Sequence, residues 1–289
     1  MRKCYVHLGK HGDLMILMPG WEREFKETGE RPIVMVAEEF ADTLEGCSYV
    51  LRWRVPLHWY GDCGQARLLA EKEFGKDNVI FPKWWDDPTF TPPRIRQNAT
   101  QLIIHGKRMA IESGEWFSYM ASQWKYAGFG MAHLSDCVNF DVRRKEVERH
   151  LRGQIFRSTK PKLLVCLNTG GSSPFPFTPE IEKMLYNFRG QFEIIDLMKV
   201  RANRIYDMLG LFDYAAGMLT TDTATLHLAS ASKIPYVAFI ANGGGGSVPR
   251  GNCVLAVRYA DTMKQEDAIH EEMIKMLNKE PSPPIEIYG

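Results

Sequence analysis

The sequence has no long hydrophobic run, and its first residues do not follow the pattern of a secretory signal. No stretch approaches the roughly 18 consecutive apolar residues that a membrane-spanning helix needs. The chain opens on a strand-like run, without a basic segment followed by a long apolar one, so a secretory signal is not expected. We therefore predict a cytoplasmic protein with no transmembrane segment, while a contact with a membrane surface stays open.

Paired cysteines and an excess of one charge are also lacking. The six cysteines are scattered, with no Cys-x-x-Cys pair and no histidine cluster at metal-ligand spacing, which predicts buried thiols in a reducing compartment and no metal site. The formal net charge is +1, and residues 1–150 hold 21 basic against 21 acidic side chains. The overall charge therefore does not predict that the protein binds a polyanion. Neither a Walker motif nor a GxGxxG motif is present.

What the sequence does contain is an alternation of apolar strands and helices. Residues Lys3–Leu8 predict a short strand, Leu14–Phe25 a helix and Pro32–Ala37 a buried parallel strand. Pro19 lies inside the helical segment, where it should kink or restart the helix. A strand, a helix and a strand in so short a segment form a βαβ unit.

The later half continues the same alternation after an irregular middle. From Val50 to Gln101, aromatic residues and prolines are frequent, and we predict short strands and long loops. A strand at Leu163–Leu167 starts a second series, which predicts a parallel sheet covered on both faces. The further predicted helices are Glu112–Gly128, Arg143–Arg152, Pro179–Phe188, Ala202–Leu209, Ala224–Ser232 and Thr262–Asn278, and the further strands are Phe192–Leu197, Met218–Thr221 and Tyr236–Ile240.

The length of 289 residues suits two α/β domains of about 150 residues each. The polar stretch Arg157–Lys162 is the candidate interdomain linker. We predict an N-terminal domain of residues 1–157 and a C-terminal domain of residues 158–289, whose last helix is a candidate for packing back on the N-terminal domain. All seven tryptophans precede residue 125, so the N-terminal domain should carry an aromatic surface or pocket.

The strongest local signal is the turn between the strand Met218–Thr221 and the helix after it. Hydroxyls and one carboxylate cluster there, with Asp222 or Thr223 as the helix N-cap. The backbone N–H groups of a helix start, together with the helix dipole, form an anion site. His227 lies one turn further on the same helical face, where it could donate to a phosphate oxygen. The plain alternative is a capped helix with His227 buried.

A second signal is the glycine-containing turn Gly9–Asp13 between the first strand and its helix. Asp13 falls at the carboxyl end of the strand, where ligands of open α/β sheets bind. A carboxylate there can act as a general base that takes a proton from an acceptor hydroxyl. The alternative is an ordinary capping aspartate. For Lys10 and His11, which flank it, solvated loop residues are the simpler interpretation.

These two segments resemble short motifs of the heptosyltransferase-like glycosyltransferase family 9. Residues Gly12–Pro19 are similar to the family's N-terminal Gly-Asp–apolar–Pro motif. Residues Thr221–Ala231, followed by Lys233–Pro235, are similar to its donor-site motif Asp-Thr-Gly-x-x-His-x-Ala-x-Ala with a following proline. The order and separation of the two motifs also match.

The resemblance implies a GT-B fold, in which two Rossmann-like parallel-sheet domains face each other across a cleft. It implies an inverting transferase that needs no metal and no cofactor, with a nucleotide-diphosphate sugar as co-substrate in the C-terminal domain. Asp13 matches the family's proposed base, with Gly12, Lys10 and His11 as supporting residues. The donor-binding residues that the resemblance implies are Thr169, Gly170, Gly171, Ser172, Thr221, Asp222, Thr223, Ala224, Thr225 and His227.

Two departures from the family pattern fall on the donor side. Ala224 stands where the family has glycine, and the loop that includes Thr169 lacks the family's lysine. Lys10 or Lys199 is then the candidate for the missing positive charge. The glycine run 243–246 is either a mobile donor loop or a flexible turn. For Asp196, at the end of a predicted strand, we favour a capping role over a contact with the nucleoside.

The acceptor has several candidates. The family resemblance implies a saccharide such as a lipopolysaccharide core, in the bacterial cytosol. A divergent bacteriophage member that modifies hydroxymethylpyrimidines in DNA, in an infected host, is an alternative, and so is a non-catalytic nucleotide- or sugar-binding protein. Interleaved cations and aromatics suit stacking on sugars or bases, although core tryptophans with solvated charges are the simpler interpretation. These segments are Arg52–Arg54, Lys83–Trp85, Arg94–Arg96, Lys107–Arg108 and Trp124–Tyr126.

Overall fold

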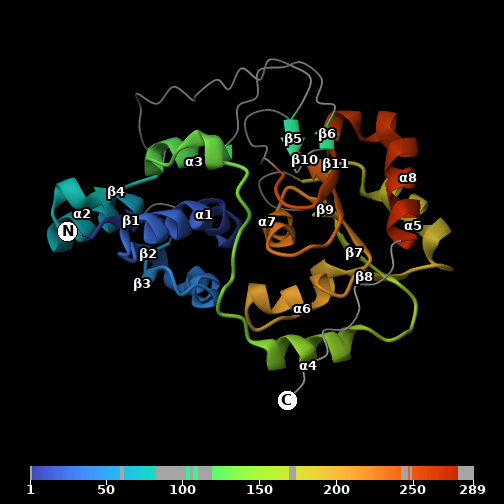
Figure 1. The fold of residues 1–289 in the computed structure, drawn as a ribbon, viewed down its shortest axis with the longest axis horizontal. Helices are drawn as coiled ribbons and strands as arrows, with labels where there is room; N and C mark the ends of the chain where they lie inside the picture. Colours follow the sequence, from blue (N-terminus) through green and yellow to red (C-terminus); the bar gives the residue numbers. More distant parts are fainter. Residues whose placement is uncertain are drawn as a thin grey trace.

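The chain folds around two parallel sheets, one in each half. The computed structural model describes residues 2–58, 62–82, 102–104, 107–109, 119–168, 174–241, 247 and 249–278. Within them lie a four-stranded sheet, a five-stranded sheet and a separate two-stranded pair. Figure 1 shows the N-terminal elements in blue on one side of the molecule and the C-terminal elements in orange and red on the other. The predicted α/β class with two parallel sheets is confirmed.

The N-terminal sheet is entirely parallel and has the strand order β3-β2-β1-β4. Parallel strands need crossover connections, which here are helices. The strands are β1 (Cys4–Val6), β2 (Ile33–Ala37), β3 (Leu51–Val55) and β4 (Val79–Ile80), and their connections hold α1 (His11–Thr28), η1 (Glu38–Gly46), α2 (Cys63–Phe74) and η2 (Lys76–Asn78).

The C-terminal sheet is also entirely parallel, in the order β11-β10-β9-β7-β8. Its strands are β7 (Lys162–Cys166), β8 (Glu193–Asp196), β9 (Gly217–Thr221), β10 (Tyr236–Ile240) and β11 (Cys253–Arg258). Its helical elements are α5 (Thr178–Phe188), η4 (Leu197–Lys199), η5 (Ile205–Met208), α6 (Leu209–Phe212), α7 (Ala224–Ser230), η7 (Tyr259–Gln265) and α8 (Glu266–Leu277). Between the sheets in sequence lie β5 (Leu102–Ile104), β6 (Lys107–Met109), α3 (Tyr119–Ala127), η3 (Met131–His133) and α4 (Lys145–Ile155).

Strand β7 explains why this sheet is covered on both faces. All five of its residues are buried, and successive side chains point to opposite faces. Leu163 and Val165 join the core beneath α5 and α8, whereas Leu164 and Cys166 join the core that holds α6 and α7. That second core also contains residues of α1 and α3, so it extends into the N-terminal half.

Helix α1 is continuous and is enclosed by other elements. Every residue from Leu14 to Trp21 is buried, and the helix packs against α3 and α7. A proline inside a helix costs about 3 kcal/mol, because it removes one hydrogen bond and crowds the carbonyl four residues earlier. The helix nevertheless runs through Pro19 without the restart that the sequence predicts.

The two helices nearest the predicted domain boundary and the end of the chain both pack on the C-terminal half. Helix α4 lies against α6 and η5 (Figure 1). Helix α8 contributes Ile269, Met273 and Met276 to the core of the C-terminal sheet. The apolar face of the last helix therefore covers its own sheet. The boundary at residues 157 and 158 itself stays a prediction.

Three elements differ from the sequence prediction. Helix α2 occupies part of the segment in which we expected only short strands and loops, and β11 was not predicted. The helix expected at Ala202–Leu209 is displaced toward the C-terminus as η5 and α6. The helix expected at Glu112–Gly128 is present as α3, and residues 112–118 lie outside the described part of the chain.

Candidate functional site

Asp13 lies in the first turn of α1, immediately beyond the carboxyl end of β1. Its Oδ2 accepts the backbone N–H of Lys10 at 2.9 Å, in the manner of a capping box in which Lys10 is the N-cap residue. Asp13 thus caps the helix start from the third helical position, whereas the alternative from the sequence made it the N-cap residue itself. The same contact fixes the carboxyl group at the end of the sheet, where ligands of parallel sheets bind.

His7 is a neighbour of Asp13 that the sequence analysis did not single out. It is buried, its Nδ1 accepts the N–H of Gly9 at 3.2 Å, and its Nε2 lies 2.9 Å from Gln123 Oε1. Because Nδ1 accepts a hydrogen bond, Nε2 carries the proton. A β-carbon on Gly9 would lie 2.6 Å from both Asp13 Cβ and His7 Cε1, so only glycine lets these groups pack so closely. Burial lowers the pKa of His7, which keeps the imidazole neutral.

The turn between β9 and α7 is built from hydroxyls that bond to one another. Thr223 is the N-cap residue by position, one of the two that the sequence proposed, but its side chain does not cap the helix. Its Oγ1 lies 2.8 Å from Thr225 Oγ1, which lies 2.9 Å from Thr220 Oγ1. Thr221 Oγ1 donates to the carbonyl of Cys166 on the neighbouring strand β7 at 3.2 Å. The turn is therefore fixed to the sheet before any ligand binds.

Asp222, the other proposed cap, connects this turn to the segment that follows β10. Its Oδ2 accepts the backbone N–H of Ser247 at 2.9 Å. Burial raises the pKa of its carboxyl group, and hydrogen bonds from Ser247 oppose that shift. Asp222 therefore anchors the residues beyond the glycine run, which itself lies outside the described part of the chain.

His227 is buried one turn into α7, so the plain alternative from the sequence describes its surroundings correctly. Burial, with a further contribution from the positive charge of Arg250, lowers the pKa of His227 to about 3. Its Nε2 lies 3.5 Å from Ser247 Oγ. At neutral pH this imidazole can offer only a neutral N–H to a phosphate and no positive charge.

The structure brings the two motifs together across the two halves of the chain. A β-carbon on Gly12 would lie 3.4 Å from Ala224 Cα and 3.6 Å from His227 Cδ2. Helices α1 and α7 are packed neighbours, as Figure 1 shows. The turn that carries Asp13 and the turn that carries Thr223 are therefore adjacent in space, although about 210 residues separate them in sequence.

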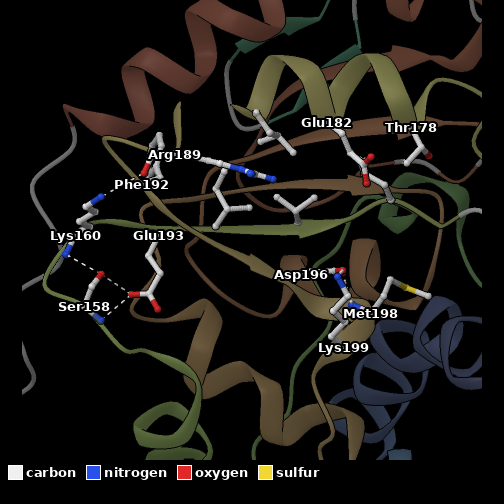
Figure 2. A pocket seen from close by; sticks show the side chains of 14 residues that line it. Ser158, Lys160, Thr178, Glu182, Arg189, Phe192, Glu193, Asp196, Met198 and Lys199 are labelled. Atoms are coloured by element: carbon white, nitrogen blue, oxygen red, sulfur yellow. Dashed lines mark hydrogen bonds and ion pairs between the residues drawn. The ribbon is translucent and has the colours of Figure 1, made fainter. Parts of the chain in front are cut away.

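A groove of about 870 Å³ lies along the C-terminal sheet at β7 and β8, beside α5. Figure 2 shows Asp196, Met198 and Lys199 at one end of it and Ser158, Lys160 and Glu193 at the other. Met198 Sδ lies 3.6 Å from Cys166 Sγ, which in turn lies 3.9 Å from Thr223 Oγ1. The side chain of Cys166 thus lies between Met198, at the first end of the groove, and Thr223, in the turn before α7.

The polar groups at that end of the groove pair with one another. Asp196 accepts the N–H of Met198 at 3.0 Å, so the capping role that we favoured is observed. Lys199 Nζ lies 3.0 Å from Asp196 Oδ2, and its side chain is 84% exposed. Lys199 can therefore move toward a ligand, because an exposed ion pair is weak.

The remaining predicted residues are His11 and the four residues of the predicted donor loop. His11 lies in the first turn of α1 with its Nδ1 2.6 Å from Thr43 Oγ1, and burial lowers its pKa. The predicted donor-loop residues lie outside the described residues, so their role stays a prediction. They are Thr169, Gly170, Gly171 and Ser172.

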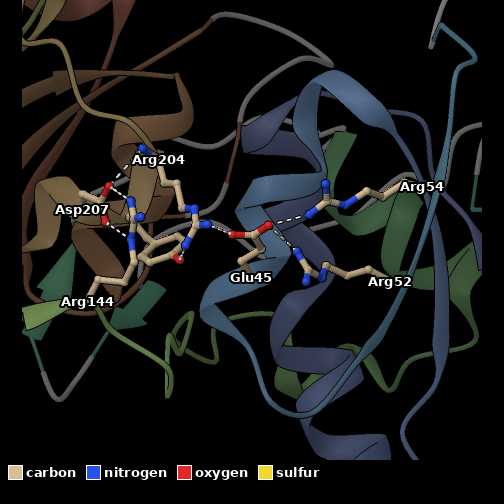
Figure 3. Close-up of polar contacts among 7 residues, drawn as sticks. Glu45, Arg52, Arg54, Arg144, Arg204 and Asp207 are labelled. Carbon is tan, nitrogen blue, oxygen red and sulfur yellow. Dashed lines mark hydrogen bonds and ion pairs between the residues drawn. The ribbon is translucent and has the colours of Figure 1, made fainter. Parts of the chain in front are cut away.

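In the cation–aromatic segments that the structure describes, Arg52, Trp53, Arg54 and Trp124 make contacts with other residues of the protein. Arg52 and Arg54 both bind Glu45, which also binds Arg204 of the C-terminal half, as Figure 3 shows. Trp53 packs edge-on against Phe74. Trp124 is fully buried and donates its Nε1 hydrogen to the carbonyl of Ile16. Trp124 is thus a core tryptophan, as the simpler interpretation has it, whereas Trp53 is only half-buried and Arg52 and Arg54 are paired with Glu45 rather than solvated. The other segments lie outside the side chains that the structure describes.

The described residues offer neither a metal site nor a membrane-spanning helix. Among the described residues, no group of three or more His, Cys, Asp or Glu side chains could hold a metal ion. No helix in that part of the chain is long and apolar enough to cross a membrane.

Two parallel sheets with adjacent turns at their carboxyl ends define an α/β protein of the GT-B class. The structure matches a glycosyl transferase family 9 protein from Veillonella parvula, with a TM-score of 0.60 and 11% identity over 96% of this chain and 97% of that one. It matches E. coli ADP-heptose LPS heptosyltransferase II with a TM-score of 0.59 and 11% identity, over 96% and 99% of the two chains.

A further match is E. coli heptosyltransferase WaaC with ADP, with a TM-score of 0.50 and 11% identity over 93% of this chain and all of that one. By sequence, neither the protein-family models nor the curated proteins give a match. The structural match to family 9 heptosyltransferases over nearly the whole chain confirms the resemblance drawn from the two short motifs. At 11% identity, what this likeness establishes is the fold.

Proposed function

We propose that this protein is an inverting, metal-independent glycosyltransferase that moves a sugar from a nucleotide-diphosphate donor to an acceptor hydroxyl. The observation that carries the proposal is the contact of Gly12 with Ala224 and His227, which sets the turn of Asp13 beside the turn before α7. A transferase needs a base and a diphosphate site within reach of one anomeric carbon. The GT-B fold shared with family 9 heptosyltransferases supports this assignment.

In the proposed reaction the Asp13 carboxylate accepts the proton of the acceptor hydroxyl. The acceptor oxygen forms a bond to the anomeric carbon while the bond from that carbon to the diphosphate oxygen breaks. The nucleoside diphosphate leaves with the electron pair of the broken bond. Attack from the face opposite the leaving group inverts the configuration of the anomeric carbon.

The leaving diphosphate has to be stabilised by hydrogen-bond donors and cations that are already in place. The backbone N–H groups around Thr223 and the neutral imidazole of His227 are the proposed donors. Lys10 and Lys199 are the proposed cations, and Lys199 needs only to exchange its exposed partner Asp196. We propose the Met198 end of the groove for the nucleoside, because it is one side chain away from Thr223.

For the acceptor we propose a saccharide hydroxyl. Arg52 and Arg54, which could have stacked on bases, pair instead with Glu45, the half-buried Trp53 packs edge-on against Phe74, and Trp124 lies in the core. Binding to phosphates along DNA would weaken steeply with salt. Salt-sensitive retardation of duplex DNA in a gel would reverse this preference.

A thermal-shift panel of ADP, UDP and GDP, each also as its glucose conjugate, tests the proposal directly. A ligand that binds only the folded state raises the unfolding temperature. Release of nucleoside diphosphate in the presence of EDTA, with an inverted product by NMR, is the expected result. Binding without any release would instead indicate a non-catalytic nucleotide-binding protein, and no binding at all would contradict both.

A further inference from the structure

Arg250 is a buried cation that joins the two halves of the chain. Only 1% of its surface is exposed. Its Nε donates to the carbonyl of Leu134 at 3.0 Å, its Nη1 to that of Met15 at 3.2 Å and its Nη2 to that of Ile16 at 3.0 Å. No ion pair to this guanidinium is found within the described residues, so its partners there are carbonyl dipoles, two of which belong to α1.

Pro19 explains why α1 has a carbonyl to offer. Proline has no N–H, so the carbonyl of Met15, four residues earlier, lacks its usual helical donor. Arg250 supplies a donor to that carbonyl from the other half of the chain. The adjacent carbonyl of Ile16 receives both Arg250 and Trp124 Nε1, the latter at 2.8 Å.

The other end of Arg250 is fixed to the C-terminal sheet. Its backbone N–H donates to Tyr236 Oη at 3.0 Å, and the Tyr236 hydroxyl donates to its carbonyl. Tyr236 is a fully buried residue of β10. The guanidinium also lies over the ring of Trp124, 5.8 Å from its centroid. Backbone and side chain are therefore held on opposite sides of the interface, which makes Arg250 a rigid connection.

We propose that Arg250 is a positioning residue, which uses the carbonyl freed by Pro19 to hold the helix that carries Asp13 against the half that carries the turn before α7. The proposal rests on the proposed transferase function for its catalytic consequence, but the contact itself can be tested without activity. The planar fork of arginine reaches three carbonyls at once, whereas a lysine has a single ammonium group. A positional role therefore predicts that lysine is a poor substitute.

A cycle of unfolding measurements tests the contact. Arg250→Met removes the donor that replaces the missing Pro19 N–H at the Met15 carbonyl, and one donor each to the carbonyls of Leu134 and Ile16, so it should lower the melting temperature. In the Pro19→Ala background, residue 19 regains an N–H that can satisfy Met15, so Arg250→Met should lower the melting temperature by a smaller amount than it does in the presence of Pro19. An equal loss in both backgrounds would contradict the proposal. Arg31→Met, at an exposed arginine, is the matched control and should change little.

A second measurement separates positioning from general stability. Well below its melting temperature, Arg250→Lys should bind ADP with unchanged stoichiometry and lose far less affinity for ADP than turnover, because the proposed donor site lies in the C-terminal half apart from Lys10. Its release of nucleoside diphosphate from ADP-, UDP- or GDP-glucose should fall at least about tenfold in kcat, since misplacing a catalytic group by about 1 Å can cost 100-fold. Equal losses of ADP binding and turnover, or no loss of either, would overturn the positional role. If the wild type neither binds nor turns over these probes, the proposed function fails, and the unfolding cycle still decides whether Pro19 and Arg250 are coupled.

Discussion

A β-carbon placed on Gly12 would lie 3.4 Å from the Cα of Ala224. This short separation connects the first turn of α1 to the first turn of α7. A side chain at position 12 would therefore act on both motifs at once.

The size of residue 12 should decide whether the site can form. Gly12→Ala should be tolerated, because 3.4 Å is close to ordinary van der Waals contact and alanine favours a helix by about 1 kcal/mol over glycine. Gly12→Val should push α7 away and reduce transfer at least about tenfold. Gly64→Val, where a β-carbon meets nothing within 4 Å, is the control. Wild-type turnover in Gly12→Val would show that the two turns need not touch.

The proposed base predicts a loss of chemistry without a loss of fold. In Asp13→Asn the amide oxygen can still accept the Lys10 N–H, so the melting temperature should change little. Transfer should fall about 100-fold or more, because the amide cannot accept the acceptor proton. ADP binding, measured by calorimetry, should persist. Asp77→Asn, at an exposed carboxylate, is the control, and retained activity in Asp13→Asn would remove the base assignment.

His227 should make the protein sensitive to acid. Its pKa is about 3 in the folded state against an ordinary value of 6.5, so between these values the unfolded chain binds the proton and the folded chain does not. The contribution of His227 to the free energy of unfolding is then fully present above pH 6.5. It is lost as the pH falls toward 3, by about 1.4 kcal/mol per pH unit at most. In His227→Gln, urea unfolding at a series of pH values should show a shallower decline. The exposed His150→Gln should keep the wild-type slope.

Glu45 should stabilise the contact between the two halves in a salt-dependent way. Burial opposes ionisation of Glu45, but its hydrogen bond to Arg52 and the charges of Arg204, Arg52 and Arg54 hold its pKa below the ordinary value. Glu45→Gln leaves these guanidinium groups to repel one another and should cost about 1–3 kcal/mol. Part of that loss should be recovered in 1 M NaCl, where repulsion is screened. A loss that does not depend on salt would exclude this electrostatic origin, with Glu73→Gln as the exposed control.

The parts of the fold that could be predicted from sequence are those with a local pattern. Continuous apolar runs predicted β7 and β10, because a strand that is buried on both faces carries apolar side chains on both. The position of Asp13 at the start of α1 and of Thr223 before α7 followed from the turn residues alone. The likeness of the two turns to family motifs then indicated that they meet.

Helix α2 was missed because its pattern is weak. It buries the small residues Cys63, Ala66 and Ala70, while Leu68 is 69% exposed, so the sequence shows no apolar stripe of large side chains. Only packing against β1 reveals the buried face.

Arg250 could not be recognised for a different reason. Its partner Met15 lies 235 residues away, and a basic residue after a glycine run resembles any surface loop. Pro19 predicts a kink or a restart of the helix, since nothing nearby in sequence shows that a distant donor compensates for the missing N–H. His7 likewise stands out only once Gly9 and Asp13 are seen against it.

The largest hydrophobic core runs from Leu14 and Trp21 of α1 through Trp124 to Leu226 and Ala238 of the other half. Each half has a smaller core of its own, but the largest core is shared between them. Expressed separately, each would present a wide apolar face to water and should aggregate or require the other half for solubility. In the intact chain, the two sheets should melt in one cooperative transition. A destabilising substitution in one half therefore also destabilises the other half. Any such substitution in the shared core should lower one common melting temperature.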